Sequence, residues 1–550
     1  MVYKEVRGLH QAAYFLAVFA LASQLLALVR DRLLAHNFGA GADLDIYYAA
    51  FRIPDLLFVL FASVLSVYVL IPFVSKKIRE KNDQAGGELL SQILTVFMLV
   101  YAVLGVACFC LAPYFIPRLF PNIVDQHALI NLTRILLLQP FFLGISNLFG
   151  VVTQLGHRFI IYAISPLLYN IGIILGILFL YPVFGLIGLG IGVVIGALLH
   201  WLIQLPFVYA SDFKIRLNFH FNWQELGSIF MLSIPRAVTL SMQQILMLVL
   251  IIFASAMTAG SVSIFQFAYN LQSVPLAIIG VSYSVAAFPV LADLYSKALH
   301  KEFSVHILTA IRHIIFWSVP IIVLIIVLRA QFVRVVLGSG AFDWADTRLT
   351  AAVLAVLVVS LLAQSIYLIA VRAFYAAGET RIPFFVTLFC SALTILFAYV
   401  SIAFYDYNES FRVLVTNTLR LDNVIGSEIL AIAFGYSLAM LVQAIFIIVL
   451  LSSKLKISLR PLIQPLWHAA LAALVGGLAA YVTLNFVVEG VDQNKFIGVF
   501  IQGLLAGLAG LMGVIMTYVY FRSVEFHEIY TSFHRKLLKV KVIAPQEEVL

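Results

Sequence analysis

Polar side chains recur at helical spacing inside several long apolar runs, and they are the residues of this sequence that could do chemistry. Spacings of three, four and seven residues place side chains on one face of a helix. The members of these faces are Tyr48, Arg52 and Asp55; Ser233, Arg236 and Gln243; Gln266, Asn270 and Ser273; Ser23 with Arg30; and Gln24 with Asp31. The faces predict a hydrated cavity for a polar ligand, because polar groups in apolar helices usually face a cavity or a partner. Interhelical hydrogen bonding between scattered polar residues is the alternative.

Arginines are the groups on these faces that would hold an anion, because a guanidinium donates two parallel hydrogen bonds. The residues predicted to line the cavity are Arg30, Arg52, Arg236, Asp45, Gln24, Asn270, Ser273 and Gln243. Two further acids, Asp31 and Asp55, are predicted gate residues. Together with Asp45 they lie close enough in sequence to pair with Arg30 or Arg52 and to release them on opening. In the alternative, each arginine is the permanent structural partner of one aspartate.

Catalytic and metal-binding patterns are weak in this sequence. Asp43-Leu-Asp45 has the D-x-D form that glycosyltransferases use, but it falls in the first predicted outer loop, away from cytoplasmic nucleotides. The sequence contains no P-loop and no H-E-x-x-H motif. We therefore predict a protein that is not an enzyme and has no cofactor or metal. An ion gradient or the membrane potential would then supply the energy.

The elements that position these residues must be membrane helices. Of the 550 residues 63% are apolar and 11% are charged, and the mean hydropathy is +1.05. A soluble domain of this size could not bury so much apolar surface. The composition excludes a cytosolic enzyme, a disordered chain and a nucleic-acid-binding module. The net charge of +8 sits mostly in loops, where membrane topology explains it.

The sequence predicts an all-α polytopic membrane protein with fourteen transmembrane helices, because a span needs about 20 mostly apolar residues. The predicted spans are 10–29, 46–74, 89–116, 127–154, 159–181, 184–208, 226–257, 260–292, 303–328, 348–375, 382–404, 427–451, 464–487 and 495–521. Lysine and arginine are concentrated in the connections that lie on the side of the termini. Both termini are therefore predicted to be cytoplasmic.

A weak repeat at an offset of six spans predicts two pseudo-symmetric six-helix lobes. The fourth span ends before His157-Arg158 and the tenth before Thr380-Arg381, and Pro72 and Pro289 close the second and eighth. We assign 1–220 to an N-lobe (spans 1–6), 221–460 to a C-lobe (spans 7–12), 461–521 to two extra helices and 522–550 to a basic cytoplasmic tail. Repeats with a site between them are typical of transporters.

The segment from Arg30 to Leu57 resembles the first motif of the MviN/MurJ lipid II flippases. It reads R-D-x-x-x-A-x-x-F-G-A-G from Arg30 to Gly41, followed by Asp45, aromatic residues and the step Arg52-Ile-Pro54. Weaker similarity continues through 165–170, 185–192, 235–281 and 372–383. The family belongs to the multidrug/oligosaccharidyl-lipid/polysaccharide exporters, and the resemblance covers roughly residues 10–520.

The resemblance implies a flippase of the bacterial cytoplasmic membrane. Members carry undecaprenyl-diphosphate-linked peptidoglycan precursor, lipid II, from the inner to the outer leaflet by alternating access. Two lobes enclose a cationic cavity, and the last two helices, here 461–521, form a groove for the lipid tail. Arg30, Asp45 and Arg52 match motif positions in the cavity or its outer gate. The implied partners are the lipid-linked precursor and membrane lipids, and no nucleic acid.

Several positions depart from the family pattern. Gln24 and Phe58 stand where members usually have arginine, and the stretch from Ala268 to Pro275 lacks the usual Asp-Arg and Glu. Arg236 would restore one positive charge. These losses keep alternatives open: a flippase or exporter for another polyprenyl-linked glycan, or a non-transporting scaffold that recruits cell-wall synthesis proteins. A membrane-bound glycosyl- or acyltransferase is disfavoured, because it lacks acid, base and metal groups.

Overall fold

The chain folds into helices throughout the part that the computed structural model describes, residues 9–487 and 496–538. Side chains at 9–17, 68, 235, 236 and 532–538 lie outside the description. No strand occurs within these residues, which confirms the all-α prediction. The α-helices of the first half are α1 (Leu9–Phe38), α2 (Ala42–Ala50), α3 (Arg52–Val64), α4 (Val67–Glu80), α5 (Asp83–Leu119), α6 (Gln126–Leu136), α7 (Leu138–Leu155), α8 (Phe159–Leu175), α9 (Tyr181–Phe184), α10 (Leu186–Leu202), α11 (Leu205–Ala210), α12 (Trp223–Ser255) and α13 (Ser261–Leu276).

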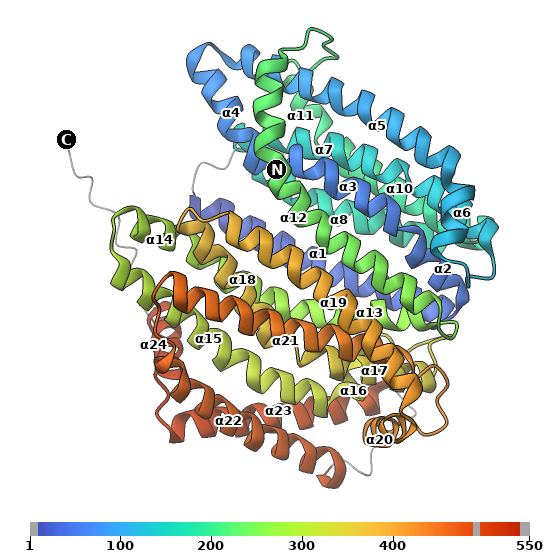
Figure 1. Ribbon diagram of the computed structural model, residues 1–550, viewed down its shortest axis with the longest axis vertical. Coiled ribbons are helices and arrows are strands. Elements are labelled where there is room, and N and C mark those ends of the chain that lie inside the picture. The colour runs from blue at the N-terminus through green and yellow to red at the C-terminus, as the bar shows by residue number, and fades with distance from the viewer. Residues whose placement is uncertain (1–8, 488–495, 539–550) are drawn as a thin grey trace. The chain divides into compact units, whose positions relative to one another are not determined.

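The second half continues in the same way (Figure 1). Its α-helices are α14 (Ser282–Ser296), α15 (His300–Val327), α16 (Arg329–Val336), α17 (Trp344–Val358), α18 (Leu361–Ala376), α19 (Arg381–Tyr407), α20 (Glu409–Leu419), α21 (Ile429–Lys454), α22 (Ile463–Val482), α23 (Phe496–Tyr520) and α24 (Val524–Leu538). Short π-helical segments follow α8, α13 and α22, at Gly176–Leu180, Ala277–Val281 and Thr483–Val487.

The protein is a multi-pass membrane protein. Twelve segments of the described residues are long and apolar enough to cross a membrane, and a thirteenth is added if α17 and α18, bent by 43°, form one span. They correspond to the second to fourteenth predicted spans. The first predicted span coincides with α1, a helix of 30 residues. The count of fourteen is consistent with this arrangement and remains a prediction.

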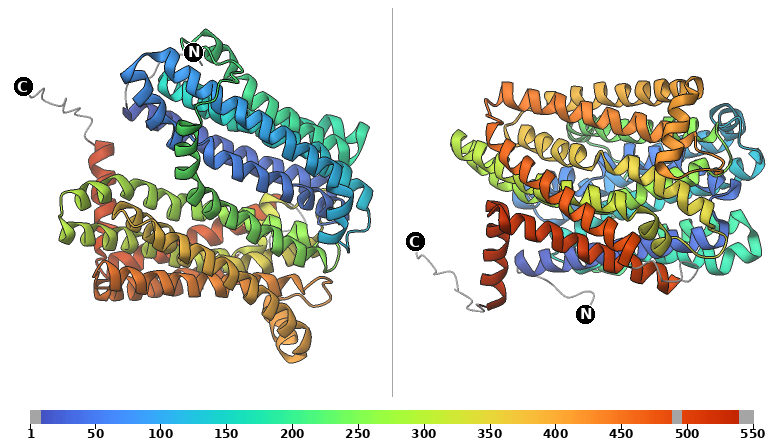
Figure 2. Two further views of the ribbon diagram at one scale, coloured as in Figure 1. Left: turned by 45° about the horizontal axis from the view of Figure 1, so that its top comes forward. Right: turned by 90° about the horizontal axis from the view of Figure 1, so that it is seen from below.

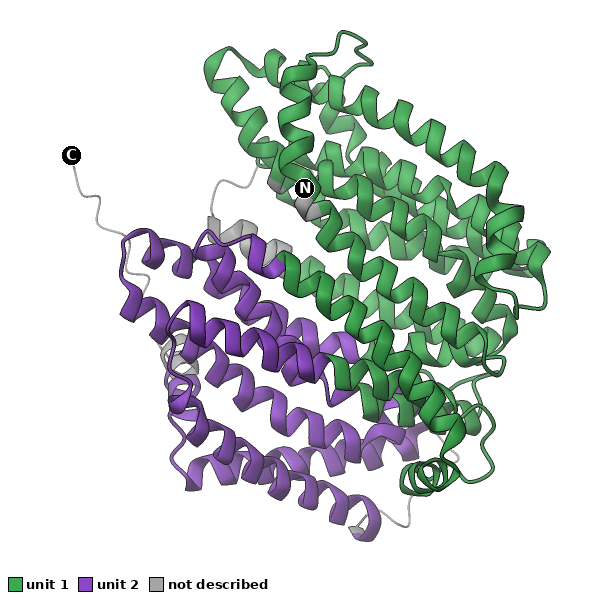
Figure 3. Cartoon of the chain, viewed as in Figure 1, with its two compact units in different colours: residues 1–271, 336–357, 384–439 green, residues 272–335, 358–383, 440–550 purple. Residues whose placement is uncertain are grey.

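The helices form two compact units (Figure 3). Unit 1 holds residues 1–271, 336–357 and 384–439, and unit 2 holds 272–335, 358–383 and 440–550. Within unit 1 the long helices among α1–α10 run alongside one another (Figures 1 and 2). The assignment of residues 1–220 and 221–460 to two symmetric lobes is a separate statement and remains a prediction.

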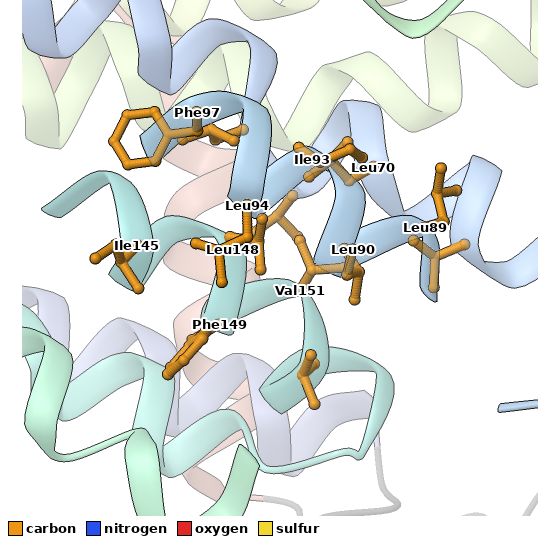
Figure 4. Packing of buried hydrophobic residues seen from close by; sticks show 14 of the residues in the cluster. Leu70, Leu89, Leu90, Ile93, Leu94, Phe97, Ile145, Leu148, Phe149 and Val151 are labelled. Carbon is orange, nitrogen blue, oxygen red and sulfur yellow. The ribbon is translucent and has the colours of Figure 1, made fainter. Parts of the chain in front are cut away.

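An apolar core holds α4, α5 and α7 together in unit 1. Leu70 of α4, Leu90 and Leu94 of α5, and Leu148 and Val151 of α7 are buried and pack as one cluster (Figure 4). Helices in a bilayer gain little from hydrophobic burial, so close packing of this kind supplies much of their association.

Glycines let α8 and α10 approach closely, as the GxxxG steps of span 6 predict. A Cβ on Gly172 of α8 would lie 2.2 Å from the Cα of Gly196, and a Cβ on Gly176, where the π-helical segment after α8 begins, would lie 2.7 Å from the Cα of Gly192. Those distances are far inside van der Waals contact, so the two backbones can touch only because both helices carry glycine. This packing fixes α8, which carries a residue of the candidate site.

Breaks in the second and eighth predicted spans occur close to prolines. Span 2 is divided into α2, α3 and α4, and the α2–α3 break at Phe51 lies just before Pro54. In span 8, Pro275 stands near the end of α13, and the π-helical turn 277–281 follows. Proline removes one backbone hydrogen bond and kinks a helix, which accounts for both positions.

Candidate polar site in unit 1

Arg52 is anchored at the start of α3. Its Nε donates to the carbonyl oxygen of Tyr48 at 3.0 Å, one helical turn earlier, and its Nη2 donates to Oε1 of Gln266 on α13 at 3.0 Å. The arginine is buried. The break at Phe51 leaves the carbonyl of Tyr48 near a helix end, where carbonyls lack an intrahelical partner. The guanidinium therefore joins α2, α3 and α13.

The hydrogen bonds continue from Gln266 along one face of α13 to α1. Gln266 donates through Nε2 to Oδ1 of Asn270, one turn away, at 2.8 Å. Asn270 in turn donates through Nδ2 to Oδ2 of Asp31 at 2.9 Å. The i, i+4 spacing recognised in the sequence thus places both amides in one line.

Asp31 forms an ion pair with its neighbour Arg30. The Nε and Nη2 atoms of Arg30 donate to Oδ1 of Asp31 at 2.9 and 2.8 Å. Nη1 of Arg30 donates to Oδ1 of Asn170 on α8 at 3.1 Å, and Asn170 donates to the hydroxyl of Ser23 at 3.3 Å. The side chain of Asp31 is 5% exposed, whereas that of Arg30 is 21% exposed. Of the two charges, the positive one is the more accessible to a ligand.

These contacts make one continuous chain across four helices, which we call the polar network. Its members are Ser23, Arg30 and Asp31 on α1, Arg52 on α3, Asn170 on α8, and Gln266 and Asn270 on α13. It holds two cations and one carboxylate, so its net charge is positive. An anion that reached Arg30 would compete with Asp31 for the same donors. Such an exchange is what a site needs if it is to bind and release a charged group.

Asp45 has partners other than arginine. Its Oδ2 accepts from the backbone N–H of Gly260 at 2.7 Å, and its Oδ1 accepts from the backbone N–H and hydroxyl of Ser263 at 2.8 and 2.7 Å. These donors stand at the N-terminus of α13, where a negative charge is favoured. The expected Asp45–arginine pair is therefore replaced by a cap that ties α2 to α13.

Asp55 likewise has a partner other than arginine, because its carboxylate accepts a hydrogen bond from the side chain of Gln139 on α7. Of the three predicted aspartate–arginine partnerships, only the Arg30–Asp31 pair forms directly. The difference has a local cause. Arg52 points toward α13, where amide oxygen atoms meet it, whereas Asp55 is one turn further on and faces α7.

The loop before α17 also packs against the end of α1. The backbone N–H of Ala40 donates to Oδ2 of Asp346 at 3.0 Å, and the N–H of Ala341 donates to the carbonyl of His36 at 2.8 Å. Gly39 has φ +60°, and a Cβ there would lie 2.7 Å from the carbonyl oxygen of Ala341. This turn therefore requires glycine, which explains part of the F-G-A-G motif. Together with Asp45, these contacts hold α1, α2 and α13 together at one end of unit 1.

Among the described side chains, Gln24 and Gln243 lie outside the network. Gln24 is partly buried on α1, and Gln243 is an exposed residue of α12 that bonds with the hydroxyl of Tyr269. Ser273 belongs to unit 2. Arg236 is a residue of α12 whose side chain lies outside the described residues.

Sequence reasoning left three network members out of the candidate site. Ser23 and Gln266 had been recognised on the polar faces of α1 and α13 without a role, and Asn170 had been noted only within the segment from Ser165 to Asn170. An amide in an otherwise apolar run was the available signal for Asn170. Its partners on α1 lie 140 and 147 residues away, so the sequence could not show them.

No group of three or more His, Cys, Asp and Glu side chains suited to a metal ion is found in the part of the chain described. The polar network offers charge and hydrogen-bond donors. It supplies no arrangement of nucleophile and base within the contacts described above.

The structure thus combines a multi-helix membrane fold with two arginines, Arg30 and Arg52, in one hydrogen-bonded network. The fold resembles that of a solved structure, a lipid II flippase MurJ in an inward closed conformation, with a TM-score of 0.71 and 22% identity over 95% of this chain and 99% of that chain. An inward-facing MATE family transporter of the MOP superfamily follows with a TM-score of 0.64, 16% identity and coverage of 79% and 94%. Both likenesses concern the fold.

The sequence comparisons are more specific. The family model for lipid II flippase MurJ matches residues 34–505. A probable lipid II flippase MurJ from Buchnera aphidicola is 30% identical over 383 residues, 68% of this chain and 74% of that protein. Its counterpart from Thermotoga maritima is 29% identical, covering 68% and 75%. This chain belongs to the MurJ family of lipid II flippases, which are transporters rather than enzymes.

Proposed function

We propose that this protein flips lipid II, the undecaprenyl-diphosphate-linked peptidoglycan precursor, from the inner to the outer leaflet of the bacterial cytoplasmic membrane. The observation that carries the proposal is the polar network of a MurJ family chain, in which Arg30 and Arg52 are held inside the helical bundle of unit 1. A diphosphate is an anion with many acceptor oxygen atoms, and guanidinium groups match it in charge and geometry.

Substrate arrival would act through the Arg30–Asp31 pair. Phosphate oxygens that accept from Arg30 displace the carboxylate of Asp31, which also accepts from Asn270 of α13. Weakening the Asp31 contacts loosens the link between α1 and α13. Binding of the headgroup is thereby coupled to movement of these helices, as alternating access requires. Arg236 on α12 is proposed as a further headgroup contact.

The tail of the substrate is assigned to α22 and α23, within residues 461–521. These helices pack closely, because a Cβ on Gly476 would lie 2.8 Å from the carbonyl oxygen of Gly510. Their outward sides are apolar, with exposed Leu474, Leu478 and Leu508. An isoprenoid tail needs such a surface at the bilayer. The ion gradient or the membrane potential is proposed to supply the energy, since one charge moved across 100 mV is worth about 2.3 kcal/mol.

Gln24 and Phe58 stand where the family usually has arginine, and they favour a second candidate substrate, another polyprenyl-linked glycan. Fewer cations weaken the hold on a diphosphate. The argument applies to a glycan whose link to the polyprenyl carrier bears fewer negative charges than a diphosphate, because such a headgroup needs fewer cations.

Genetic replacement tests the proposal. The gene is expressed in a bacterium depleted of its own lipid II flippase, and growth is scored together with delivery of lipid II to the outer leaflet. Rescue is expected from the wild type. Arg30→Ala and Arg52→Ala should lower transport about tenfold or more, the cost of one lost charge-assisted contact. Arg30→Lys should keep part of it, because the charge stays and the fork is lost.

Arg134→Ala is the matched control, because this arginine lies within predicted span 4 but donates to the carbonyl oxygen of Phe109, outside the network. It should transport normally. Failure of the wild type to rescue, despite normal membrane insertion, would reject lipid II as the substrate. Normal transport by well-expressed Arg30→Ala and Arg52→Ala would remove the network from the binding site. Likewise, normal transport by a well-expressed Arg236→Ala variant would remove α12 from the binding site.

A further inference from the structure

A cavity of unit 1 lies away from the polar network, at the C-terminal end of α12. It encloses about 580 Å³ and is lined by residues of α12, α19 and the segment that joins α19 to α21, which includes α20. Volumes of a few hundred cubic ångströms are typical of sites for small molecules and lipid headgroups. Under the predicted topology, this end of α12 and α19 faces the outer leaflet.

One wall of the cavity is apolar and continues into the membrane surface. Phe253 of α12 and Tyr399 and Ile402 of α19 form this wall, and the rings of Phe253 and Tyr399 lie 6.5 Å apart. Tyr399 is 63% exposed, and its α19 neighbours Leu396 and Val400 are exposed as well. Exposed apolar side chains on a membrane-spanning helix contact acyl chains. A tyrosine near the helix end is typical of the interface with the headgroups.

Helix α20 lies beside the cavity and has the composition of an interfacial helix. Val413 and Leu414 are exposed on one side of this helix, and Val415 is buried on the other. Asn408 caps its N-terminus by accepting from the backbone N–H of Phe411 at 2.9 Å. Helices with one apolar exposed face lie in the interface between water and acyl chains. The cavity mouth is therefore placed at headgroup level.

The other wall of the cavity carries charges of both signs. Asp406 and Glu428 supply carboxylates, and Arg412 of α20 supplies a guanidinium. Glu428 is held in place, because its Oε1 accepts from the backbone N–H of Thr258 at 3.1 Å and from the Thr258 hydroxyl. Arg412 is 4.0 Å from the exposed carboxylate of Glu409, a loose contact that leaves its donors available.

We propose that this cavity binds a phospholipid with a zwitterionic, primary-ammonium headgroup. The ammonium donates to Asp406 and Glu428, which as carboxylates accept only. The phosphate accepts from Arg412. An acyl chain follows the apolar wall past Tyr399 along α19. A lipid with an anionic headgroup would satisfy Arg412 and place its remaining groups against two carboxylates, so the mixed charge favours the zwitterion. The site goes beyond the proposed flipping function and does not depend on it.

The test measures which lipid the full-length protein retains. The protein is reconstituted with equal amounts of phosphatidylethanolamine, phosphatidylglycerol and phosphatidylcholine, extracted, and analysed by native mass spectrometry. Phosphatidylethanolamine should be retained in preference to the other two. Asp406→Asn and Arg412→Gln should each weaken its retention about tenfold, the effect of one lost charge-assisted hydrogen bond. Soluble glycerophosphoethanolamine should not displace the lipid, because it lacks the acyl chains.

Asp422→Asn is the matched control, since it removes a carboxylate from an exposed position in the same connection but outside the cavity lining. It should retain the lipid as the wild type does. Thermal melting shows whether each variant is folded. Equal retention of phosphatidylglycerol by the wild type would overturn the proposal, as would unchanged retention by folded Asp406→Asn and Arg412→Gln. Displacement by glycerophosphoethanolamine alone would show a soluble zwitterion site instead.

Discussion

At the scale of single residues, the two arginines of the polar network differ in the groups that accept their hydrogen bonds. Arg30 and Asp31 are neighbours in sequence and partners in space, so α1 carries its own neutralising pair. Arg52 instead bonds to amide and carbonyl oxygen atoms, which leave its charge uncompensated by direct contact. A buried arginine of this kind is costly in a membrane and is usually retained for function. We therefore regard Arg52 as the stronger anchor and Arg30 as the switchable one.

Asp45→Asn should destabilise the contact between α2 and α13. The carboxylate accepts three hydrogen bonds through two oxygen atoms. An amide has one oxygen, so either Gly260 or Ser263 would face an N–H₂ group. The loss of charged hydrogen bonds should cost about 1.5–3 kcal/mol, measured as a lower melting temperature in detergent. The exposed neighbour Asp43→Asn is the control, and equal melting of the two variants would show that the cap is unimportant.

At the scale of elements, helix contacts in this protein depend on small residues and on a few ion pairs. The α8–α10 contact depends on glycine, and α24 is attached to α15 by charge. Arg312 donates to Oε1 of Glu525 at 2.7 and 2.6 Å, and His313 contacts Glu528 at 3.0 Å. An added side-chain carbon disturbs the glycine contact, whereas acid or the loss of a charge disturbs the ion pair. Each kind of contact can therefore be tested separately.

Gly196→Ala should separate α8 from α10. The added Cβ would lie 2.4 Å from the carbonyl oxygen of Tyr169, which is backbone and cannot move aside as a side chain would. Overpacking of this kind costs about 1–3 kcal/mol, seen as a lower melting temperature and a lower yield of folded protein. Gly227→Ala on α12 is the matched control, because nothing lies within 4 Å of its added Cβ. Equal stability of both variants would contradict the packing argument.

The contact of Glu525 with Arg312, which attaches α24 to α15, should persist at neutral pH and be lost in acid. Burial acts to raise the pKa of Glu525, but hydrogen bonds from Ser523 and Arg312 hold it below its ordinary value of 4.5. A carboxylate with a depressed pKa stabilises the folded arrangement above its unfolded value. That stabilisation is lost as the pH falls through the lower, folded value. Hydrogen-exchange protection of α24 should therefore decrease below pH 4.5.

Glu525→Gln should remove this protection already at pH 7, because the ion pair with Arg312 is gone. Glu302→Gln, at an exposed position of α15, is the control and should leave α24 protected. Wild-type protection in Glu525→Gln would mean that α24 is held by apolar contacts instead.

At the scale of the whole molecule, the count of spans and their orientation are the central expectations. Fourteen spans place both termini in the cytoplasm. A cysteine in place of Lys76, in the last turns of α4, should then be reached by label only from inside, and one in place of Asp422 only from outside. Both positions are well exposed. The experiment uses a chain without its native cysteines.

Outside label on residue 76, or no outside label on residue 422, would reject the orientation. A tag on the N-terminus decides whether α1 is a span. If α1 did not cross the membrane, the two termini would lie on opposite sides, and the tag would be accessible from outside the cell. The position of the phospholipid cavity in the outer leaflet depends on this result as well.

The sequence by itself determined the membrane environment, helical structure in each of the predicted segments and the polar faces of α1 and α13. It could do so because these properties are local: hydropathy and a period of 3.6 residues depend only on near neighbours. The family could be recognised for a related reason, since the stretch from Arg30 to Arg52 is continuous in the chain. The glycine at position 39 within it has a local meaning too, a backbone turn with positive φ.

Only the tertiary structure decided which polar groups meet. Asn170 reaches Arg30 across 140 residues, and Gln266 reaches Arg52 across 214. Asp45 lies seven residues from Arg52 in the chain yet caps α13, and Asp55 turns to Gln139. The physical reason is that a buried charge takes whatever donors or acceptors the packing of helices brings within about 3 Å. That packing depends on all the helices together, and no local pattern records it.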